Sequence, residues 1–261
     1  MLEPVRVLSQ QGLVRVELAR WDERLVVVKR LLGVSAEVAR RLEREADVVR
    51  KLDHPHIVPL LAAFDGNLVY AYVPGSDLSA LLDGPPLPVA RAVKVVADVL
   101  RALEHAHLHG VVHCDVKPAN VLLKGERALL TDFGFAKDLA LTAITGDQEL
   151  LGTPNYMAPE QFRGIRTDHR SDLYGVGAVL FHCLVGEPPY GSQVVRWLVG
   201  DDRVPLAPLP AAAAALEPVV RRALARAPEE RFGSASEMLA TLLAAFAPAL
   251  APVPAPAQGP I

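Results

Sequence analysis

The fold and the chemistry of this chain are best inferred from one stretch, His113-Cys114-Asp115-Val116-Lys117-Pro118-Ala119-Asn120-Val121-Leu122-Leu123. It places a carboxylate, an ammonium group and an amide directly before a short apolar strand. Asp115 could accept a proton from an attacking hydroxyl, Lys117 could hold a transferring phosphoryl group, and Asn120 could bind a metal ion. Phosphoryl transfer uses this layout, because positioning and charge neutralisation provide nearly all of its catalysis. The simpler alternative is a polar loop between two structural elements.

A second acidic position follows at Asp132-Phe133-Gly134. Short strands are predicted at Val121–Leu123 and Ala128–Thr131, on either side of a turn at Gly125. These strands would deliver Asn120 and Asp132 to one place. Mg²⁺ prefers carboxylate, amide, water and phosphate oxygens, so the two side chains form a candidate metal site. Asp132 is the stronger candidate ligand because its carboxylate carries a full charge.

Two motifs carry a resemblance to a known family. HCDVKPANVLL, residues 113–123, resembles the catalytic loop of protein kinases. LGTPNYMAPE, residues 151–160, resembles the end of a serine/threonine kinase activation segment. Further motifs of the family occur in order between residues 4 and 246. The chain therefore resembles the bacterial serine/threonine protein kinases of the eukaryotic-like (Hanks) type.

The resemblance implies an α+β, two-lobed protein kinase fold. A small antiparallel β-sheet lobe with one helix would occupy residues 1–73, and a larger, mainly helical lobe residues 74–246, so that the catalytic domain spans 1–246 and a Pro/Ala-rich tail 247–261. The residue pattern predicts strands at Val5–Leu8, Val14–Ala19 and Arg24–Arg30, a loop at Ser9–Leu13, a helix at Ser35–Leu52, a hairpin from Val58–Phe64 and Leu68–Val73, and a helix at Val89–His109. Further helices are predicted at Ser171–Val185, Ser192–Val199, Ala212–Ala225 and Ser234–Phe246, the last with a capping box from Ser234 and Glu237.

The resemblance also implies catalytic roles for four residues. Asp115 would be the base that orients the hydroxyl, and Lys117 would neutralise the transferring group. Lys29, at the end of the third predicted strand, would contact the α- and β-phosphates and would be held there by Glu45. Without the resemblance, Lys29 is as readily a strand-end lysine, and Glu45 is more readily a glutamate that faces water.

Nucleotide and metal sites are implied in the same way. The nucleotide site would be formed by Lys29, Val16, Val27, Ala71, Tyr72, Val73 and Leu122, and the metal site by Asn120 and Asp132. Tyr70 would be the gatekeeper beside adenine. The implied cofactors are ATP and Mg²⁺, with Mn²⁺ as a possible alternative. Two further roles are structural: Asp172 would tie its helix to the catalytic loop, and Arg231 would pair with Glu160.

Three features depart from the family pattern. Ser9, Gln11 and Val14 stand where the three glycines of the phosphate-covering loop belong. Because glycine lets the backbone approach phosphates closely, ATP affinity is the property most affected. Cys114 replaces the arginine that reads a phosphorylated activation segment, so activity is expected not to depend strongly on that phosphorylation. Val27 stands where alanine is usual, which narrows the adenine pocket slightly.

Composition excludes several other classes of protein. Of the 261 residues 51% are hydrophobic and 22% charged, which indicates a globular chain, and the net charge of −3 does not favour a nucleic-acid partner. The two cysteines, Cys114 and Cys183, cannot build a disulfide framework and are typical of a cytoplasmic protein. The start of the sequence lacks the pattern of a signal peptide, and no apolar run is long enough to span a bilayer. The oligomeric state is not predicted.

These observations lead to one preferred function and two alternatives. The preferred function is a serine/threonine protein kinase that transfers the γ-phosphoryl group of Mg-ATP to Ser or Thr hydroxyls of a protein substrate. The first alternative is a pseudokinase, a nucleotide- or protein-binding module with little turnover, which the missing glycines favour. A small-molecule phosphotransferase is a more distant alternative. The three histidines His105, His107 and His109 suggest a metal site, but a spacing of two on a helix does not place them on one face.

Overall fold

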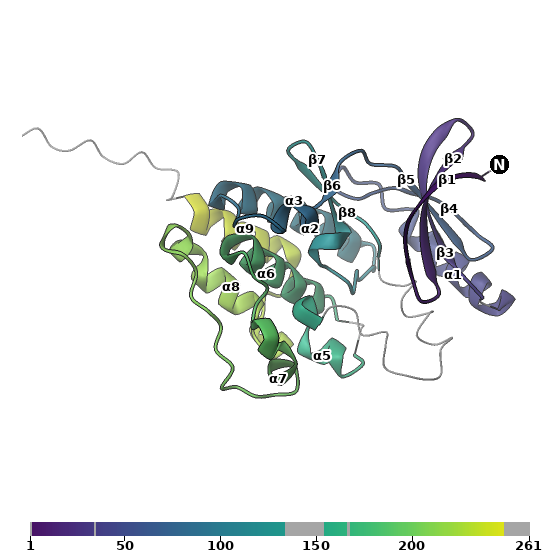
Figure 1. Ribbon diagram of the computed structural model, residues 1–261. Coiled ribbons are helices and arrows are strands. Elements are labelled where there is room, and N and C mark those ends of the chain that lie inside the picture. Colours follow the sequence, from purple (N-terminus) through teal and green to yellow (C-terminus); the bar gives the residue numbers. More distant parts are fainter. Residues whose placement is uncertain (1, 34, 134–153, 166–167, 248–261) are drawn as a thin grey trace, which may run out of the picture.

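The structure is a computed structural model, and it describes residues 2–33, 35–133, 154–165 and 168–247 (Figure 1). Five antiparallel strands form the sheet of a small lobe: β1 (Leu2–Gln11), β2 (Val14–Trp21), β3 (Arg24–Leu31), β4 (Leu60–Phe64) and β5 (Asn67–Ala71). Their order in the sheet is β1-β2-β3-β5-β4. Helix α1 (Ala36–Val49) packs against this sheet and completes the lobe.

Alternation along the strands gives the sheet two different faces. Val26, Val28 and Val69 are buried on the outer face. Lys29 and Tyr70 are buried on the opposite face, which meets the rest of the molecule. Because side chains alternate at a period of two, one strand can supply both faces. The alternation along β3 therefore positions Lys29 toward the interior of the protein.

The first hairpin differs from the sequence prediction. Residues Ser9 to Gln11 were expected in a loop, but β1 continues to Gln11 and pairs with Val14, so that only Gly12 and Leu13 form the turn. Gly12 has a φ of +52°, in the left-handed region that glycine adopts without strain. Pairing with β2 keeps the polar residues at the end of β1 in the strand, although such residues have little preference for strands.

Helix α1 follows the sequence prediction closely. The Ser35 hydroxyl accepts a hydrogen bond from the Val38 N–H and caps the first turn. Leu42, Ala46 and Val49 form the buried stripe that faces the sheet. The helix ends at Val49, three residues earlier than the predicted Leu52, with Arg50 as its C-cap.

A second, three-stranded sheet lies beside the first (Figure 1). It consists of β6 (Ser76–Asp77), β7 (Val121–Lys124) and β8 (Arg127–Leu130), in that order. Gly75 allows β6 to approach β7, since a Cβ at this position would lie 2.1 Å from the Leu123 carbonyl oxygen. Ile57 forms a parallel bridge to Leu130, which connects the segment before β4 to the end of β8.

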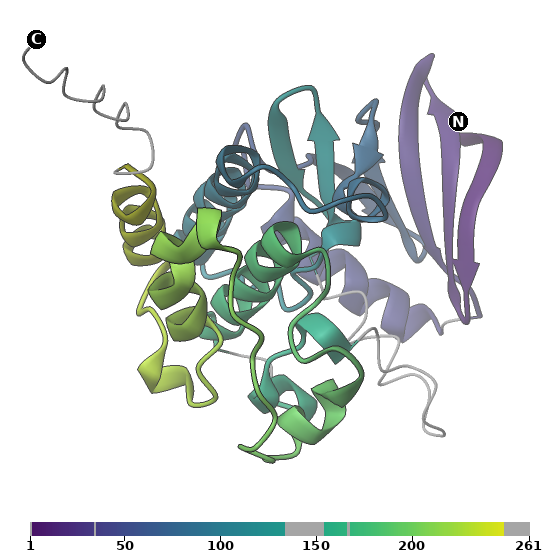
Figure 2. The same cartoon turned by 60° about the vertical axis from the view of Figure 1, so that its left-hand side comes forward.

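The large lobe is mainly helical, as the sequence predicted (Figure 2). Its α-helices within the described residues are α2 (Leu78–Leu82), α3 (Val89–Leu108), α5 (Pro159–Phe162), α6 (Arg170–Val185), α7 (Val194–Leu198), α8 (Glu217–Ala223) and α9 (Ala235–Phe246). Helix α6 is almost wholly buried and contacts α3 and α8. No helix of the described part has both the length and the apolar character needed to cross a membrane.

The first turns of some helices in this lobe differ in detail from the prediction. The helix expected at Ala212–Ala225 begins as a 3₁₀ segment, Ala211–Leu216, and becomes α-helical only at Glu217. Pro218 occupies the first turn of α8, where its missing N–H costs no hydrogen bond. At α9, Ser234 caps Glu237 as predicted, but the Glu237 carboxylate accepts from the Gly233 N–H rather than completing a box with Ser234.

Candidate active site

One buried carboxylate fixes the backbone of the predicted catalytic loop. Asp172, in the first turn of α6, is 1% exposed and accepts 2.8 Å hydrogen bonds from the N–H groups of His113 and Cys114. It also bonds to His107 Nε2 at 2.9 Å. Cys114 has a φ of +63°, which is uncommon for a residue with a side chain. Charge-assisted bonds to Asp172 hold this conformation, and they confirm the predicted connection between α6 and the loop.

His113 supports the loop from the other side. The ring is fully buried, its Nδ1 accepts from the Asp115 N–H at 3.2 Å, and its Nε2 lies 2.9 Å from the Thr131 carbonyl oxygen. Because a carbonyl only accepts, this pattern assigns the proton to Nε2 of a neutral ring. Burial lowers the pKa of His113 and outweighs the nearby charge of Asp172. The ring therefore joins the catalytic loop to the residue before Asp132.

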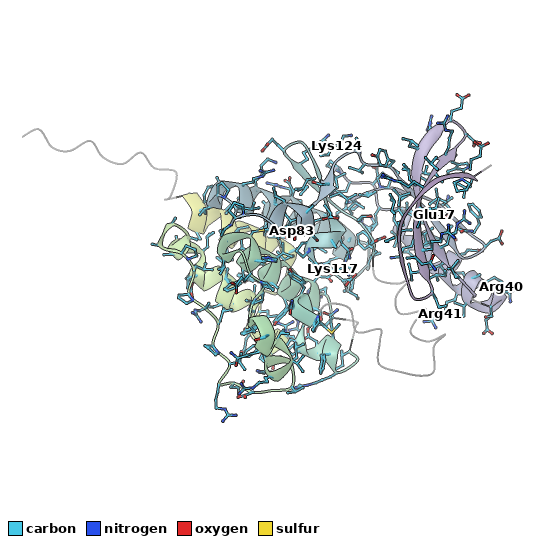
Figure 3. The ribbon with its side chains drawn as sticks, viewed as in Figure 1. Glu17, Arg40, Arg41, Asp83, Lys117 and Lys124 are labelled. Atoms are coloured by element: carbon cyan, nitrogen blue, oxygen red, sulfur yellow. The ribbon has the colours of Figure 1, made fainter. Side chains whose placement is uncertain are left out.

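Two polar side chains of the loop, Lys117 and Asn120, both contact Asp115. Asp115 Oδ2 lies 3.0 Å from Lys117 Nζ and accepts a 2.8 Å hydrogen bond from Asn120 Nδ2. The same amide donates to the Asp115 carbonyl oxygen at 2.8 Å. Figure 3 shows Lys117 near the middle of the molecule, between the five-stranded sheet and the helices of the large lobe. The loop thus presents a carboxylate held by a cation and an amide.

Two further residues support the loop and were not found by sequence reasoning. Gln161 Nε2 donates to the Cys114 carbonyl oxygen at 2.9 Å, and its Oε1 accepts from the Ala158 N–H. Gly175 lies against Val116, where a Cβ would be 2.9 Å from both the Cβ and the carbonyl oxygen of Val116. The sequence offered only their positions as a signal. Gln161 directly follows the MAPE motif, and Gly175 comes three residues after Asp172.

Lys29 of β3 reaches across to the large lobe. Its ammonium group lies 3.5 Å from the Asp132 carboxylate, and the two side chains are 11% and 29% exposed. The expected partner Glu45 lies in α1, but its side chain is outside the described side chains. The pairing of Lys29 with Glu45 therefore stays a prediction, while Lys29 and Asp132 are brought together.

Strand pairing brings the two candidate metal ligands close. The Thr131 N–H donates to the Asn120 carbonyl oxygen at 2.9 Å, and Val121 pairs with Leu130, so Asp132 follows directly on the strand beside Asn120. Asn120 Nδ2 is directed at Asp115, which leaves the amide Oδ1 as the acceptor on the other side.

The chemistry of this donor set fits a hard divalent cation. In the described part of the chain no group of three or more His, Cys, Asp or Glu side chains could hold a metal. One carboxylate and one amide oxygen are nevertheless the kind of partial shell that Mg²⁺ uses when phosphates and water supply its other ligands.

The apolar residues expected at the adenine site come from both lobes. Val16 and Val27 of the five-stranded sheet, Val73 after β5 and Leu122 of β7 are each half-buried. Val27, Val73 and Leu122 pack against the main core but keep part of their surface accessible. Half-buried aliphatic side chains are suited to contact with a flat, apolar ring, and their place at a nucleotide stays a prediction.

The hinge segment is only partly available for hydrogen bonding. The Ala71 N–H already donates to the Pro59 carbonyl oxygen at 2.9 Å. Tyr72 and Val73 lie beyond the end of β5, outside any helix or strand. The contacts of Ala71, Tyr72 and Val73 with a nucleobase stay a prediction.

The strand pair β1–β2 occupies the place of the family's glycine-rich cover. Ser9 pairs with Val16, and Val16 pairs with Lys29 in the next strand. Paired residues of antiparallel strands share a face, so Ser9 lies on the face that carries Lys29. That Ser9 stands where the family uses glycine stays a prediction.

The predicted ion pair of Glu160 and Arg231 is present in the large lobe. The two guanidinium nitrogens Nη1 and Nη2 donate to the two carboxylate oxygens at 2.6 and 2.7 Å. Arg231 is fully buried as a side chain, and Ser171 Oγ donates to Glu160 as well. Burial would raise the pKa of Glu160, but the bonds from Arg231 and Ser171 outweigh it and lower the pKa.

Some predicted features lie elsewhere or outside the described residues. Gly134, after Asp132 and Phe133, and Thr153 of the LGTPNYMAPE motif fall in residues 134–153, which the structure does not describe. The three histidines at the end of α3 do not all meet: His107 bonds to Asp172, while the rings of His105 and His109 lie together with centroids 4.4 Å apart.

Comparison with known proteins identifies the family. The model of the protein kinase domain family matches residues 10–241, and the chain belongs to this family. It is similar to the serine/threonine-protein kinase PknJ of Mycobacterium bovis, with 38% identity over 258 residues that cover 89% of this chain and 43% of PknJ. It is also similar to PknB of Mycobacterium leprae, with 36% identity over 271 residues that cover 91% of this chain and 42% of PknB. The chain thus spans less than half the length of these relatives.

Solved structures support the fold. The crystal structure of the PknI kinase domain of Mycobacterium tuberculosis matches with a TM-score of 0.70 and 32% identity, over 94% of this chain and 96% of that chain. The two-lobed kinase fold predicted from the sequence is therefore confirmed. Membership of the family implies ATP and a divalent metal as cofactors.

Proposed function

We propose that this chain is a serine/threonine protein kinase that transfers the γ-phosphoryl group of ATP to Ser or Thr hydroxyls of proteins. The observation that carries the proposal is the assembly of one polar cluster from distant segments. Lys117 and Asn120 contact Asp115, and Lys29 contacts Asp132, which follows the strand paired with Asn120. Membership of the protein kinase family and the similarity to serine/threonine kinases support the same function.

Each residue of the cluster has a task in this proposal. Asp115 orients the substrate hydroxyl and accepts its proton as the bond to phosphorus forms. Lys117 neutralises charge on the transferring group, and Lys29, held by Glu45, binds the α- and β-phosphates. These tasks need fixed positions, which the contacts of Asp172, His113 and Gln161 with the loop provide.

The metal is proposed to be Mg²⁺, with Mn²⁺ able to take its place. Asn120 and Asp132 would hold it, and the metal would supply charge neutralisation at the phosphates. Oxygen ligands of this kind, completed by phosphates and water, suit both ions, and Mg²⁺ is the harder of the two.

A protein substrate is preferred to a small molecule. Lys117 contacts Asp115, where it can meet a Ser or Thr hydroxyl, and the segment that begins at Pro154 is attached to the loop through Ala158 and Gln161. In the family this segment serves a peptide. The specific protein that is phosphorylated is not assigned.

Labelled Mg-ATP and a generic basic protein test the proposal. Transfer of the label to Ser and Thr of that protein, abolished in Asp132→Asn, is the expected result. If nucleotide binds but no label is transferred at high ATP concentration, the chain is a binding module, and the proposal is overturned.

A further inference from the structure

Tyr70 lies on the face of the small-lobe sheet that meets the active site. In the strand register, Tyr70 pairs with Val27, and Leu68 pairs with Lys29. Paired residues share a face and alternate residues of one strand do so too, so Tyr70 is on the same face as Lys29. Tyr70 also belongs to the core cluster that contains Phe133, the residue after Asp132.

The hydroxyl of Tyr70 is buried without a hydrogen-bond partner. The residue is 3% exposed, and its Oη has no partner among the described protein groups. Buried polar groups in folded proteins are nearly always paired, because an unpaired one loses its hydration without compensation. Phenylalanine would fill the same space at no such cost. An acceptor for this hydroxyl is therefore expected in the working state of the site.

Asp132 is the charged group whose influence reaches Tyr70. Burial chiefly, and then the negative charge of Asp132, raise the pKa of Tyr70 well above its usual value. The hydroxyl consequently keeps its proton and can only serve the carboxylate as a donor. Asp132 has Lys29 as a partner at 3.5 Å, and Lys29 is also the residue expected at the phosphates.

We propose that Tyr70 is a positioning residue for Asp132: with nucleotide and metal bound, its hydroxyl donates a hydrogen bond to the Asp132 carboxylate, directly or through one buried water. The bond replaces the contact with Lys29 when that ammonium group serves the phosphates. It orients the carboxylate toward the metal from a rigid strand of the small lobe. This inference rests on the proposed function, because it assigns a partner to the metal ligand of that site.

The test compares Tyr70→Phe with the wild-type protein and with Tyr190→Phe. Tyr190 offers a matched control, since it is a tyrosine of the large lobe that stacks on Trp197 of α7. Binding of ADP is measured by thermal shift or calorimetry, first with a chelator and then in a titration with Mg²⁺. These readouts do not depend on turnover. The unfolding midpoint of each ligand-free protein is measured alongside.

The proposal predicts a selective effect on the metal. In Tyr70→Phe the affinity of the ADP complex for Mg²⁺ falls about tenfold, as expected for one lost hydrogen bond to a charged group, while metal-free ADP binds as in the wild type. The ligand-free unfolding midpoint is unchanged or higher, because the hydroxyl has no partner there. Tyr190→Phe leaves both affinities unchanged.

Three results would overturn the proposal. These are an unchanged Mg²⁺ affinity, an equal loss of metal-free and metal-dependent binding, and a lower unfolding midpoint, which would show that the hydroxyl already has another partner. Failure of the wild-type protein to bind Mg-ADP at all would instead count against the proposed function.

Discussion

The ammonium group of Lys29 lies 3.5 Å from the carboxylate of Asp132. This ion pair joins β3 of the small lobe to the residues that follow β8 in the large lobe. Lys29 is only 9% exposed, so the charge sits where solvent screens it poorly. The pair therefore marks the place where the two lobes bring opposite charges together, and the proposed function puts the phosphates and the metal there.

Removing the cation at this place is expected to impair catalysis. Lys29→Met should lower kcat/KM by about 10²- to 10³-fold, the size of effect seen when one preorganised charge-stabilising group is lost. Steady-state kinetics with ATP as the varied substrate measure it. Lys124→Met is the matched control, because Lys124 is exposed at the end of β7 and should retain full activity. Equal activity of the two variants would remove Lys29 from the mechanism.

Cys114 leads to a prediction about regulation. The loop conformation at this residue is held by Asp172 and Gln161, and a thiol cannot pair with a phosphate as arginine does. Single changes Thr142→Ala and Thr145→Ala should therefore leave kcat within about twofold. Kinase assays on the two variants measure this. Large losses of kcat in both variants would show that activity requires phosphorylation of the activation segment.

The buried pair Glu160–Arg231 should matter for stability. Glu160→Gln leaves the fully buried guanidinium of Arg231 without its counter-charge, which should lower the free energy of unfolding by about 3–5 kcal/mol. Denaturant unfolding measures the change. Arg221→Gln, which breaks an exposed pair with Glu217 one helical turn away, should change it by no more than about 0.5 kcal/mol. Similar effects of both variants would contradict the structural role.

Three histidines with lowered pKa values should make the folded protein less stable in acid. Burial is the largest cause that lowers the pKa of His54, of His113 and of His182 below the ordinary value of 6.5. Below that pH the unfolded chain binds protons that the folded protein does not, so folding stability is complete above it and decreases as the pH falls. Unfolding midpoints measured from about pH 8 to about pH 5 should show this decrease.

The variant His54→Gln tests how much of that pH dependence comes from His54. This ring stacks on His105 with centroids 5.2 Å apart, and His105 and His56 both lower its pKa after burial. His54→Gln should flatten the decrease below pH 6.5 and leave the pH 8 midpoint nearly unchanged. An identical slope in the variant and the wild type would exclude His54 as a contributor.

The sequence motifs were sufficient to predict the elements that carry Lys29, Asp115, Asn120 and Asp132. Hydrophobic periodicity was also sufficient for α1 and α3, because their buried stripes are strong. The contact of Lys29 with Asp132 could not be predicted from spacing, since it depends on how the two lobes approach each other. The Tyr70 hydroxyl, which has no partner among the described groups, likewise becomes visible only in the folded structure.

The misplaced loop at Ser9–Leu13 has a similar origin. Ser9, Gln10 and Gln11 have little intrinsic preference for a strand, and the comparison with a glycine-rich loop suggested an irregular segment. Their pairing with Val16, Arg15 and Val14 of the next strand decides the outcome. Cross-strand pairing overrides local preference at a sheet edge, and no single-sequence pattern reports it.

The most direct measurement of the central claim separates nucleotide binding from phosphoryl transfer at Asp115. Transfer of γ-phosphate from Mg-ATP to Ser- and Thr-containing peptides is compared between the wild type and Asp115→Asn, with ADP affinity measured on both. The account predicts labelled Ser and Thr with the wild type, a kcat lower by about 10²- to 10⁴-fold in Asp115→Asn, and an ADP affinity within about twofold. Equal transfer by both proteins, or none by a wild type that binds Mg-ATP, would contradict it.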